Sequence, residues 1–141
     1  MLYFCRAKPI SEYRRGCKLC SKMFESRRII YRRGFFEPLT TKISDIISNT
    51  LHSKSQPIKI FDAGCGEGTL LSRIQENITQ SSETDHLGVG LDISKEAICL
   101  AAKEYTNKIW CVGDLAKAPF ANQQFNFILN ILTPANYAGS M

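Results

Sequence analysis

Three glycines and two carboxylates stand close together in the stretch 61–70, which has the sequence FDAGCGEGTL. A short apolar run precedes the glycines, and a segment with helical spacing of leucine and isoleucine follows them. Gly64 and Gly66 are expected to adopt positive φ and, having no Cβ atom, to let the backbone approach a ligand. Gly68 is expected to open the helix, whose first N–H groups are free to face a polar group. The stretch therefore predicts a ligand site between a strand and a helix, although G-x-G-x-G spacing is also common in tight turns.

The spacing and the charge of this loop favour one kind of nucleotide ligand over another. Dinucleotide-binding loops follow G-x-G-x-x-G and bring a pyrophosphate to the helix. Here Thr69 stands where that pattern has its third glycine, and Glu67 would repel a pyrophosphate. S-adenosylmethionine instead has a cationic sulfonium and an amino-acid end. We therefore predict S-adenosylmethionine as the cofactor, with Asp62 and Glu67 facing its ammonium or sulfonium region and backbone N–H groups facing its carboxylate.

Two more carboxylates follow the next two predicted strands. Asp92 ends the second strand, where an acid is expected to accept hydrogen bonds from both ribose hydroxyls, and Asp114 follows the third strand, where it is expected to accept from the adenine amino group. Ile93 and Leu115, the residues next to them, are expected to sandwich the adenine ring. Each feature also has a structural interpretation, because an aspartate at the end of a strand often caps the following helix.

These residues need a sheet to position them, and the chain alternates between helical and strand patterns. The expected elements are helices at about 20–31, 38–51, 67–78 and 94–105, the last capped by Ser94, and strands at 58–63, 87–92, 109–112 and 125–132. This order predicts an α/β fold with a Rossmann-like, doubly wound parallel sheet, preceded by a basic helical segment. The usual strand order, 3-2-1-4, would leave the fourth strand as an exposed apolar edge that offers a route to self-association.

The charge is distributed unevenly along the 141 residues, which have a formal net charge of +5. Residues 1–33 contain ten Lys and Arg against two acids, whereas residues 34–141 contain eight against eleven. A basic segment on a mildly acidic body favours a polyanionic partner such as RNA, with the segment 6–33 contacting phosphates. The alternative is a solvated, partly disordered leader.

Cysteine usage and hydropathy indicate a reducing, water-soluble setting. The six cysteines have irregular spacing. Cys17 and Cys20 form one C-x-x-C pair, and with Cys5 they supply three of the four ligands that a structural zinc site needs, so we expect free thiols and no metal. No apolar run has the length of a membrane span, and the first ten residues do not resemble a secretory signal. A cytoplasmic protein without a membrane partner is the expectation.

Five segments together resemble one family of enzymes: 24–39, 62–71, 90–105, 118–120 and 130–137. Over residues 24–138 the chain is similar to class I methyltransferases, and more narrowly to the 23S rRNA guanine-N1-methyltransferases of the RlmA type. The resemblance implies methyl transfer from S-adenosylmethionine to a ring nitrogen of guanine in 23S rRNA. It divides the chain into a basic leader, 1–23, and a partial methyltransferase domain, 24–141, with the first four of the usual seven strands.

The resemblance also implies roles for individual residues. Gly66 and Glu67 fall at positions that contact the cofactor, and Phe36 falls at an aromatic position beside it, although Phe36 is equally compatible with a place in the core. Asn130 and Pro134 would border the acceptor pocket, and no general base is identified. Two alternatives remain open: a truncated fragment that binds cofactor or RNA without turnover, and a methyltransferase that acts on a small molecule.

Overall fold

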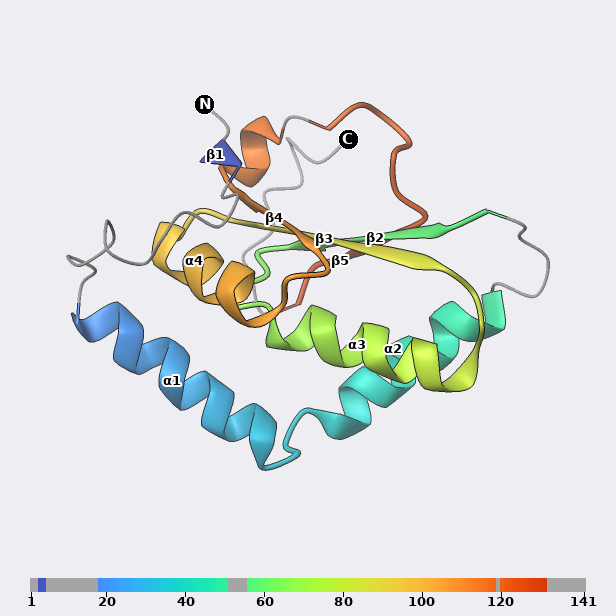
Figure 1. Cartoon of the computed structure of the whole chain (residues 1–141), viewed down its shortest axis with the longest axis horizontal. Coiled ribbons are helices and arrows are strands. Elements are labelled where there is room, and N and C mark those ends of the chain that lie inside the picture. The colour runs from blue at the N-terminus through green and yellow to red at the C-terminus, as the bar shows by residue number, and fades with distance from the viewer. Residues whose placement is uncertain (1–2, 5–17, 51–55, 119, 132–141) are drawn as a thin grey trace.

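The computed structural model describes residues 3–4, 18–50, 56–118 and 120–131, and it forms an α/β arrangement around one sheet (Figure 1). The elements are β1 (Tyr3–Phe4), α1 (Lys18–Arg32), α2 (Glu37–Thr50), β2 (Ile58–Ala63), α3 (Thr69–Ser81), β3 (His86–Asp92), α4 (Lys95–Glu104), β4 (Ile109–Val112), the short 3-10 helix η2 (Leu115–Lys117) and β5 (Phe127–Leu129). In the described part of the chain no helix has both the length and the apolar character that crossing a bilayer requires.

The sheet has the order β1-β4-β3-β2-β5. Strands β4, β3, β2 and β5 are parallel to one another, so the expected 3-2-1-4 order of four strands is confirmed. The register pairs Asp62 with both Gly90 and Leu129, and Asp92 with Val112. The carboxyl ends of the four parallel strands therefore meet along one edge, which is where an open α/β sheet binds its ligand.

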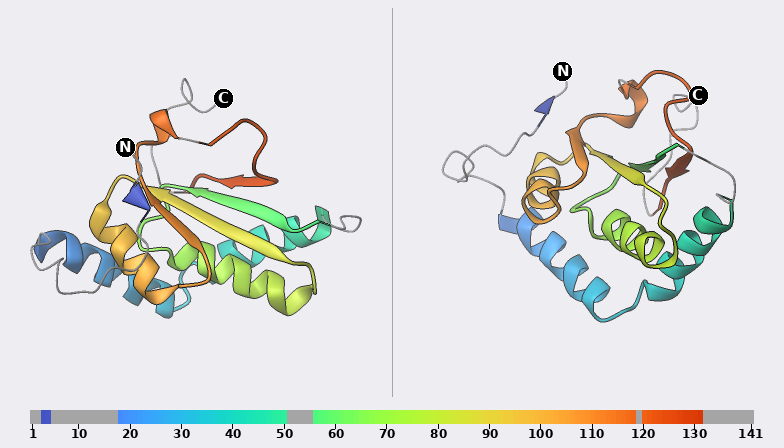
Figure 2. Two further views of the ribbon diagram at one scale, coloured as in Figure 1. Left: turned by 45° about the horizontal axis from the view of Figure 1, so that its top comes forward. Right: turned by 45° about the vertical axis from the view of Figure 1, so that its right-hand side comes forward.

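The four α-helices lie on one side of the sheet, and the segment after β4 crosses the other side (Figures 1 and 2). The helix side is filled by aliphatic side chains such as Ile60, Leu71, Ile74 and Ile98, which are fully buried. Side chains in a strand point alternately to the two faces, so Phe61 faces the other side, where it packs on two aromatic rings of the segment after β4. The central strand β2 is thus buried on both faces from Ile60 to Ala63, although by different means.

Several elements differ from their expected bounds for local reasons. Helix α3 begins at Thr69, two residues later than expected, because Gly68 precedes it in the left-handed conformation, with φ of 82°. Strand β5 contains only 127–129 because Phe125 leaves the strand to stack on Phe61, with ring centroids 4.9 Å apart. Helix α1 begins at Lys18, within the segment expected to be a leader, and Tyr3–Phe4 pairs antiparallel with β4, which the sequence did not predict.

Candidate functional site

The glycine loop between β2 and α3 has the backbone conformation that its sequence predicts. Gly64, Gly66 and Gly68 all have positive φ, at 81°, 57° and 82°. The N–H groups of Gly64 and Cys65 both donate to the carbonyl oxygen of Leu91, at 2.8 and 3.1 Å, which fixes the loop to the end of β3. The loop is therefore held in place by the neighbouring strand.

Close packing adds a second requirement for glycine in this loop. A Cβ atom on Gly68 would lie 2.4 Å from Cη2 of Trp110, and one on Gly90 would lie 2.5 Å from Cζ3 of the same ring. The indole N–H of Trp110 donates to the carbonyl oxygen of Tyr105 at 2.8 Å, which fixes the ring beneath the loop. The third glycine of the loop thus accommodates a tryptophan of the protein itself.

Asp92 links the two strand ends. Its Oδ2 accepts a hydrogen bond from the N–H of Gly66 at 2.8 Å, and its Oδ1 accepts one from the N–H of Ser94 at 2.8 Å. Ser94 in turn caps α4, because its hydroxyl oxygen accepts from the N–H of Ala97 at 3.2 Å. The capping role considered for Asp92 is therefore indirect, because Asp92 holds Ser94, the N-cap residue of α4, and the carboxylate also orients the glycine loop.

Asp114 has a capping bond of the same kind at the end of β4. Its Oδ1 accepts from the N–H of Ala116 at 2.9 Å and its side chain is exposed. Ile93 is 76% exposed, whereas Leu115 is half-buried against the cluster around Phe61. The structure thus brings Asp92, Ile93, Asp114 and Leu115 to the carboxyl ends of adjacent strands.

Asp62 and Glu67 form the most unusual part of the site. Each is only 1% exposed, and neither Oδ2 of Asp62 nor Oε2 of Glu67 has a hydrogen-bond partner among the described residues. Burial, reinforced by the nearby Asp92 carboxylate, raises the pKa of Asp62 to about 7. A buried carboxylate oxygen without a donor is costly, so these two oxygens fit a ligand that brings cationic or hydrogen-bond-donating groups.

Arg27 is a site residue that the sequence interpretation missed. A Cβ atom on Gly66 would lie 3.3 Å from Nη1 of Arg27, so the guanidinium packs directly on the loop. The positive charge of Arg27 lowers the pKa of Asp62 and so opposes the effect of burial. It also lowers the pKa of Tyr31, although burial has the larger effect there and the pKa of Tyr31 is raised overall. Phe24 and Tyr31, three residues before and four after, are both buried. Helical periodicity could therefore have placed Arg27 on the inward face of α1 instead of among the solvated basic residues.

The remaining expected site residues, Phe36, Asn130 and Pro134, differ in burial and in whether the structure describes them. Phe36 is half-buried, with its ring centroid 4.6 Å from that of Tyr31 and 5.1 Å from that of Phe35, so its place in the core is real. Asn130 follows β5 and is exposed. Pro134 lies outside the described residues.

The cysteines considered as zinc ligands all lie in the basic N-terminal segment. Cys5 and Cys17, like the side chain of Cys20, lie outside the described residues. Within the described ranges no group of three or more His, Cys, Asp or Glu side chains could hold a metal ion.

Comparison with known proteins gives one family match and several similar structures. A family described as "Methyltransferase domain" matches residues 54–139. The protein named "Putative 23S rRNA (guanine-N(1)-)-methyltransferase YxjB" of Bacillus subtilis (strain 168) is 39% identical over 121 residues. That match covers 84% of this chain but 41% of the relative, so the chain spans about two fifths of that protein.

Two solved structures support the fold. The chain superimposes on a "putative s-adenosyl-l-methionine-dependent methyltransferase" from Methanococcus maripaludis with a TM-score of 0.64 at 18% identity, covering 89% of this chain and 57% of that one. It superimposes on the plantazolicin methyltransferase BpumL, solved in complex with a triazolic desmethylPZN analogue and SAH, with a TM-score of 0.53 at 24% identity, covering 80% and 40%. The Rossmann-like arrangement expected from the sequence is therefore confirmed.

Proposed function

The chain belongs to the methyltransferase domain family, and from this premise we propose that it forms the cofactor-binding part of an enzyme that methylates a ring nitrogen of guanine in 23S rRNA. The cofactor is S-adenosylmethionine, because the family and the SAH-bound neighbour share that donor. The observation that carries the proposal is the pair of buried oxygens, Asp62 Oδ2 and Glu67 Oε2, which receive no donor from the described protein. An ammonium group supplies the hydrogen bonds that these oxygens lack and adds to the positive charge of the nearby Arg27.

The adenosine part of the cofactor is assigned to the strand ends. A carboxylate has about four lone-pair sites, and the N–H groups of Gly66 and Ser94 use one on each oxygen of Asp92. One site on each oxygen is then left for the two ribose hydroxyls, so capping and ligand binding are compatible in Asp92. Asp114 is assigned to the adenine amino group in the same way, with the ring between Ile93 and Leu115.

Gly64, Gly66 and Gly68 allow the methionine part to lie against the loop backbone, and Phe36 is assigned to the wall beside it. When bound, S-adenosylmethionine supplies a methyl group on an already activated sulfonium sulfur. The protein's contribution is to orient the donor and to match its charges. Asn130 follows β5 on the strand edge that carries Asp62, and with Pro134 it is assigned to the border of the acceptor pocket.

Two observations favour RNA as the acceptor. The relative with 39% identity carries an rRNA guanine-N1-methyltransferase name. The first 33 residues also have ten basic side chains against two acidic ones, a composition suited to phosphates. A domain that binds cofactor or RNA without turnover is the second candidate. Among the described strands β5 forms one edge of the sheet, where Ile128 is 65% exposed, and such an apolar edge suits association with another chain.

The test has two parts. Calorimetric titration of the chain with S-adenosylhomocysteine is expected to show saturable binding that weakens at least tenfold in Glu67→Gln, as the loss of a charge-assisted hydrogen bond requires. Asp45→Asn, which removes an exposed carboxylate of α2, is the matched control and should bind like the wild type. Transfer of tritium from methyl-labelled cofactor to unmodified 23S rRNA then tests the reaction. Cofactor binding without incorporation would leave the second candidate as the answer. No cofactor binding by a folded chain would reject the enzyme and the cofactor-binding form of the second candidate.

A further inference from the structure

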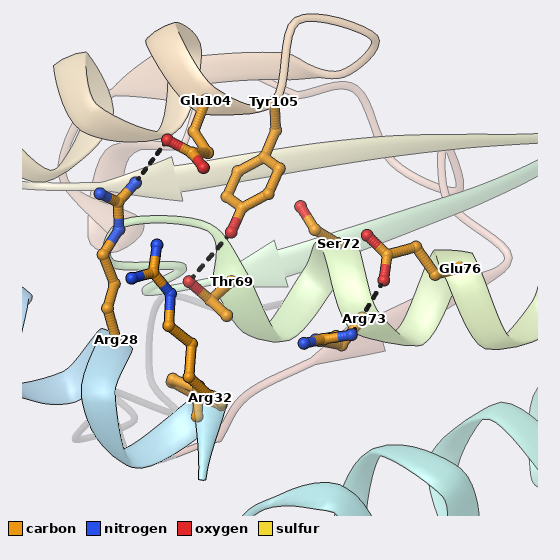
Figure 3. A pocket seen from close by; sticks show the side chains of 9 residues that line it. Arg28, Arg32, Thr69, Ser72, Arg73, Glu76, Glu104 and Tyr105 are labelled. Atoms are coloured by element: carbon orange, nitrogen blue, oxygen red, sulfur yellow. Dashed lines mark hydrogen bonds and ion pairs between the residues drawn. The ribbon is translucent and has the colours of Figure 1, made fainter. Parts of the chain in front are cut away.

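A pocket lies between α1, α3 and the end of α4, on the helix side of the sheet (Figure 3). Its volume is about 220 Å³. Three arginines line it, Arg28 and Arg32 from α1 and Arg73 from α3. Thr69, the residue that directly follows the glycine loop, also lines it. The pocket is therefore next to the cofactor site but built from different side chains.

The positive charge of this pocket is only partly compensated. Arg28 pairs with Glu104 at 3.2 Å and Arg73 pairs with Glu76 at 3.4 Å, in both cases with exposed partners. Arg32 makes no ion pair with any residue that the structure describes, and its guanidinium points toward the Thr69 and Tyr105 side of the pocket (Figure 3). Exposed ion pairs contribute little and exchange easily, so the pocket has one excess positive charge and two more guanidinium groups that can turn to a stronger anion.

A buried hydroxyl in the wall of the pocket also lacks a partner. Ser72 is 1% exposed, and its Oγ makes no hydrogen bond in the described part of the chain. It lies one turn of α3 after Thr69, whose hydroxyl is 3.2 Å from that of Tyr105. A buried hydroxyl without a partner is costly, and this one faces the Tyr105 side of the pocket (Figure 3). The wall thus offers a free O–H donor beside the guanidinium groups.

We propose that this pocket binds one phosphodiester of the RNA substrate, with Arg32 as the main contact and Ser72 as a hydrogen-bond donor. The inference rests on the proposed function for the identity of its ligand. A phosphodiester has a single negative charge, which matches the excess charge, and its oxygens suit the planar fork of arginine. Because Thr69 lines the pocket and directly follows the glycine loop, the bound RNA strand would be held beside the cofactor.

The test compares two neighbouring arginines. Arg32→Gln removes the unpaired guanidinium of the pocket, and Arg33→Gln removes the same charge from the next, exposed residue, which does not line the pocket. Binding of a fluorescently labelled single-stranded RNA 12-mer is measured by anisotropy from about 50 to 200 mM salt. Release of about 0.7 counterion per phosphate at about 0.1 M salt corresponds to roughly fivefold in affinity. Arg32→Gln should therefore weaken binding about fivefold and reduce the salt slope by about 0.7, and Ser72→Ala should weaken it in the same direction.

The controls separate failure of this inference from failure of the proposed function. Binding of S-adenosylhomocysteine and the thermal midpoint should be unchanged in both arginine variants, because neither side chain belongs to the cofactor site. If the wild type binds RNA and the two variants lose affinity equally, general charge explains the binding and the pocket is rejected. If the wild type binds cofactor but no RNA, both the pocket and the RNA part of the proposed function are rejected.

Discussion

Asp62 is expected to lose a proton when the cofactor binds. In the unliganded chain its carboxyl is 1% exposed, and burial, with Asp92 next in effect, raises its pKa to about 7. A cationic ammonium beside Oδ2 would favour the ionised form and lower this pKa toward the ordinary value of 3.8. Cofactor binding and deprotonation of Asp62 should therefore be linked, and each should promote the other.

The size of the linkage follows from the pKa of about 7. At pH 7 about half of the unliganded molecules hold the proton, so binding should release about 0.5 proton, falling to about 0.1 at pH 8. If the ionised form binds much more tightly than the protonated form, the apparent affinity should be up to about tenfold weaker at pH 6 than at pH 8. A return of the Asp62 pKa from about 7 to 3.8 corresponds to roughly 4 kcal/mol, an upper limit for the coupling.

The assay is titration with S-adenosylhomocysteine between pH 6 and 8 in two buffers of different ionisation enthalpy. The difference in apparent binding enthalpy between the buffers gives the number of protons released. Asp62→Asn cannot ionise and should show no release in this range. Burial lowers the pKa of His86, which is the other group to consider near this pH range. Its ring nitrogens contact Gln75 and Thr79, away from the loop. Any protons that His86 exchanges on binding should therefore be the same in the wild type and in Asp62→Asn. Equal release by wild type and Asp62→Asn, or no release by the wild type, would refute the reasoning.

The same carboxyl gives the unliganded chain a definite pH dependence of stability. A group whose pKa is higher in the folded state binds more protons there than in the unfolded chain, so the free energy of unfolding falls as pH rises. For Asp62 the window runs from its ordinary pKa of 3.8 to about 7. Urea unfolding should therefore show a decrease in stability across this window that is absent in Asp62→Asn.

Three further variants test packing, capping and the sheet edge. Gly68→Ala places a Cβ atom 2.4 Å from Trp110 at a φ of +82° and should cost about 2–5 kcal/mol in urea unfolding, whereas Gly34→Ala, with φ of +75° but nothing within 4 Å, should cost only about 1–2 kcal/mol. Asp92→Asn leaves one of two backbone N–H donors without an acceptor, which should lower the free energy of unfolding by about 1–3 kcal/mol. The affinity for S-adenosylhomocysteine should also fall. Ile128→Lys puts a charge on the exposed edge strand, and any concentration-dependent dimer of the wild type in sedimentation should disappear.

The parallel sheet could be predicted because its signals are local. Apolar runs separated by helical segments fix the alternation of strand and helix, and right-handed crossovers then leave few possible strand orders. The pairing of Tyr3–Phe4 with β4 has no such signal, because a two-residue strand has no periodicity and its partner is more than 100 residues away. The late start of β5, at Phe127 instead of Phe125, likewise depends on a tertiary contact, the stacking of Phe125 on Phe61.

The candidate site was predictable where topology alone positions the residues. Asp62 and Asp92 lie at the carboxyl ends of β2 and β3, and Asp114 follows β4, so a parallel sheet must bring them to one edge. The position of Arg27 depends on how α1 packs against α3 and α4, which lie three and five elements later in the chain. No local sequence pattern fixes that packing. The packing reason for glycine at position 68 could not be predicted either, because the ring that leaves no room for a Cβ atom there, Trp110, comes from β4.

The carboxylates of the site fall into two groups with opposite energetic roles. Asp92 and Asp114 accept backbone N–H groups, so their orientation is fixed before a ligand arrives, and their loss should reduce both stability and affinity. Asp62 and Glu67 are buried with oxygens that no described donor satisfies, so replacing them by amides should leave stability unchanged or higher at neutral pH while affinity falls. The free-energy cost of these unsatisfied oxygens is removed when a ligand binds, since the ligand supplies the missing donors. The opposite signs expected for stability in Asp92→Asn and Asp62→Asn, together with loss of affinity in both, distinguish a ligand site from a merely well-capped loop.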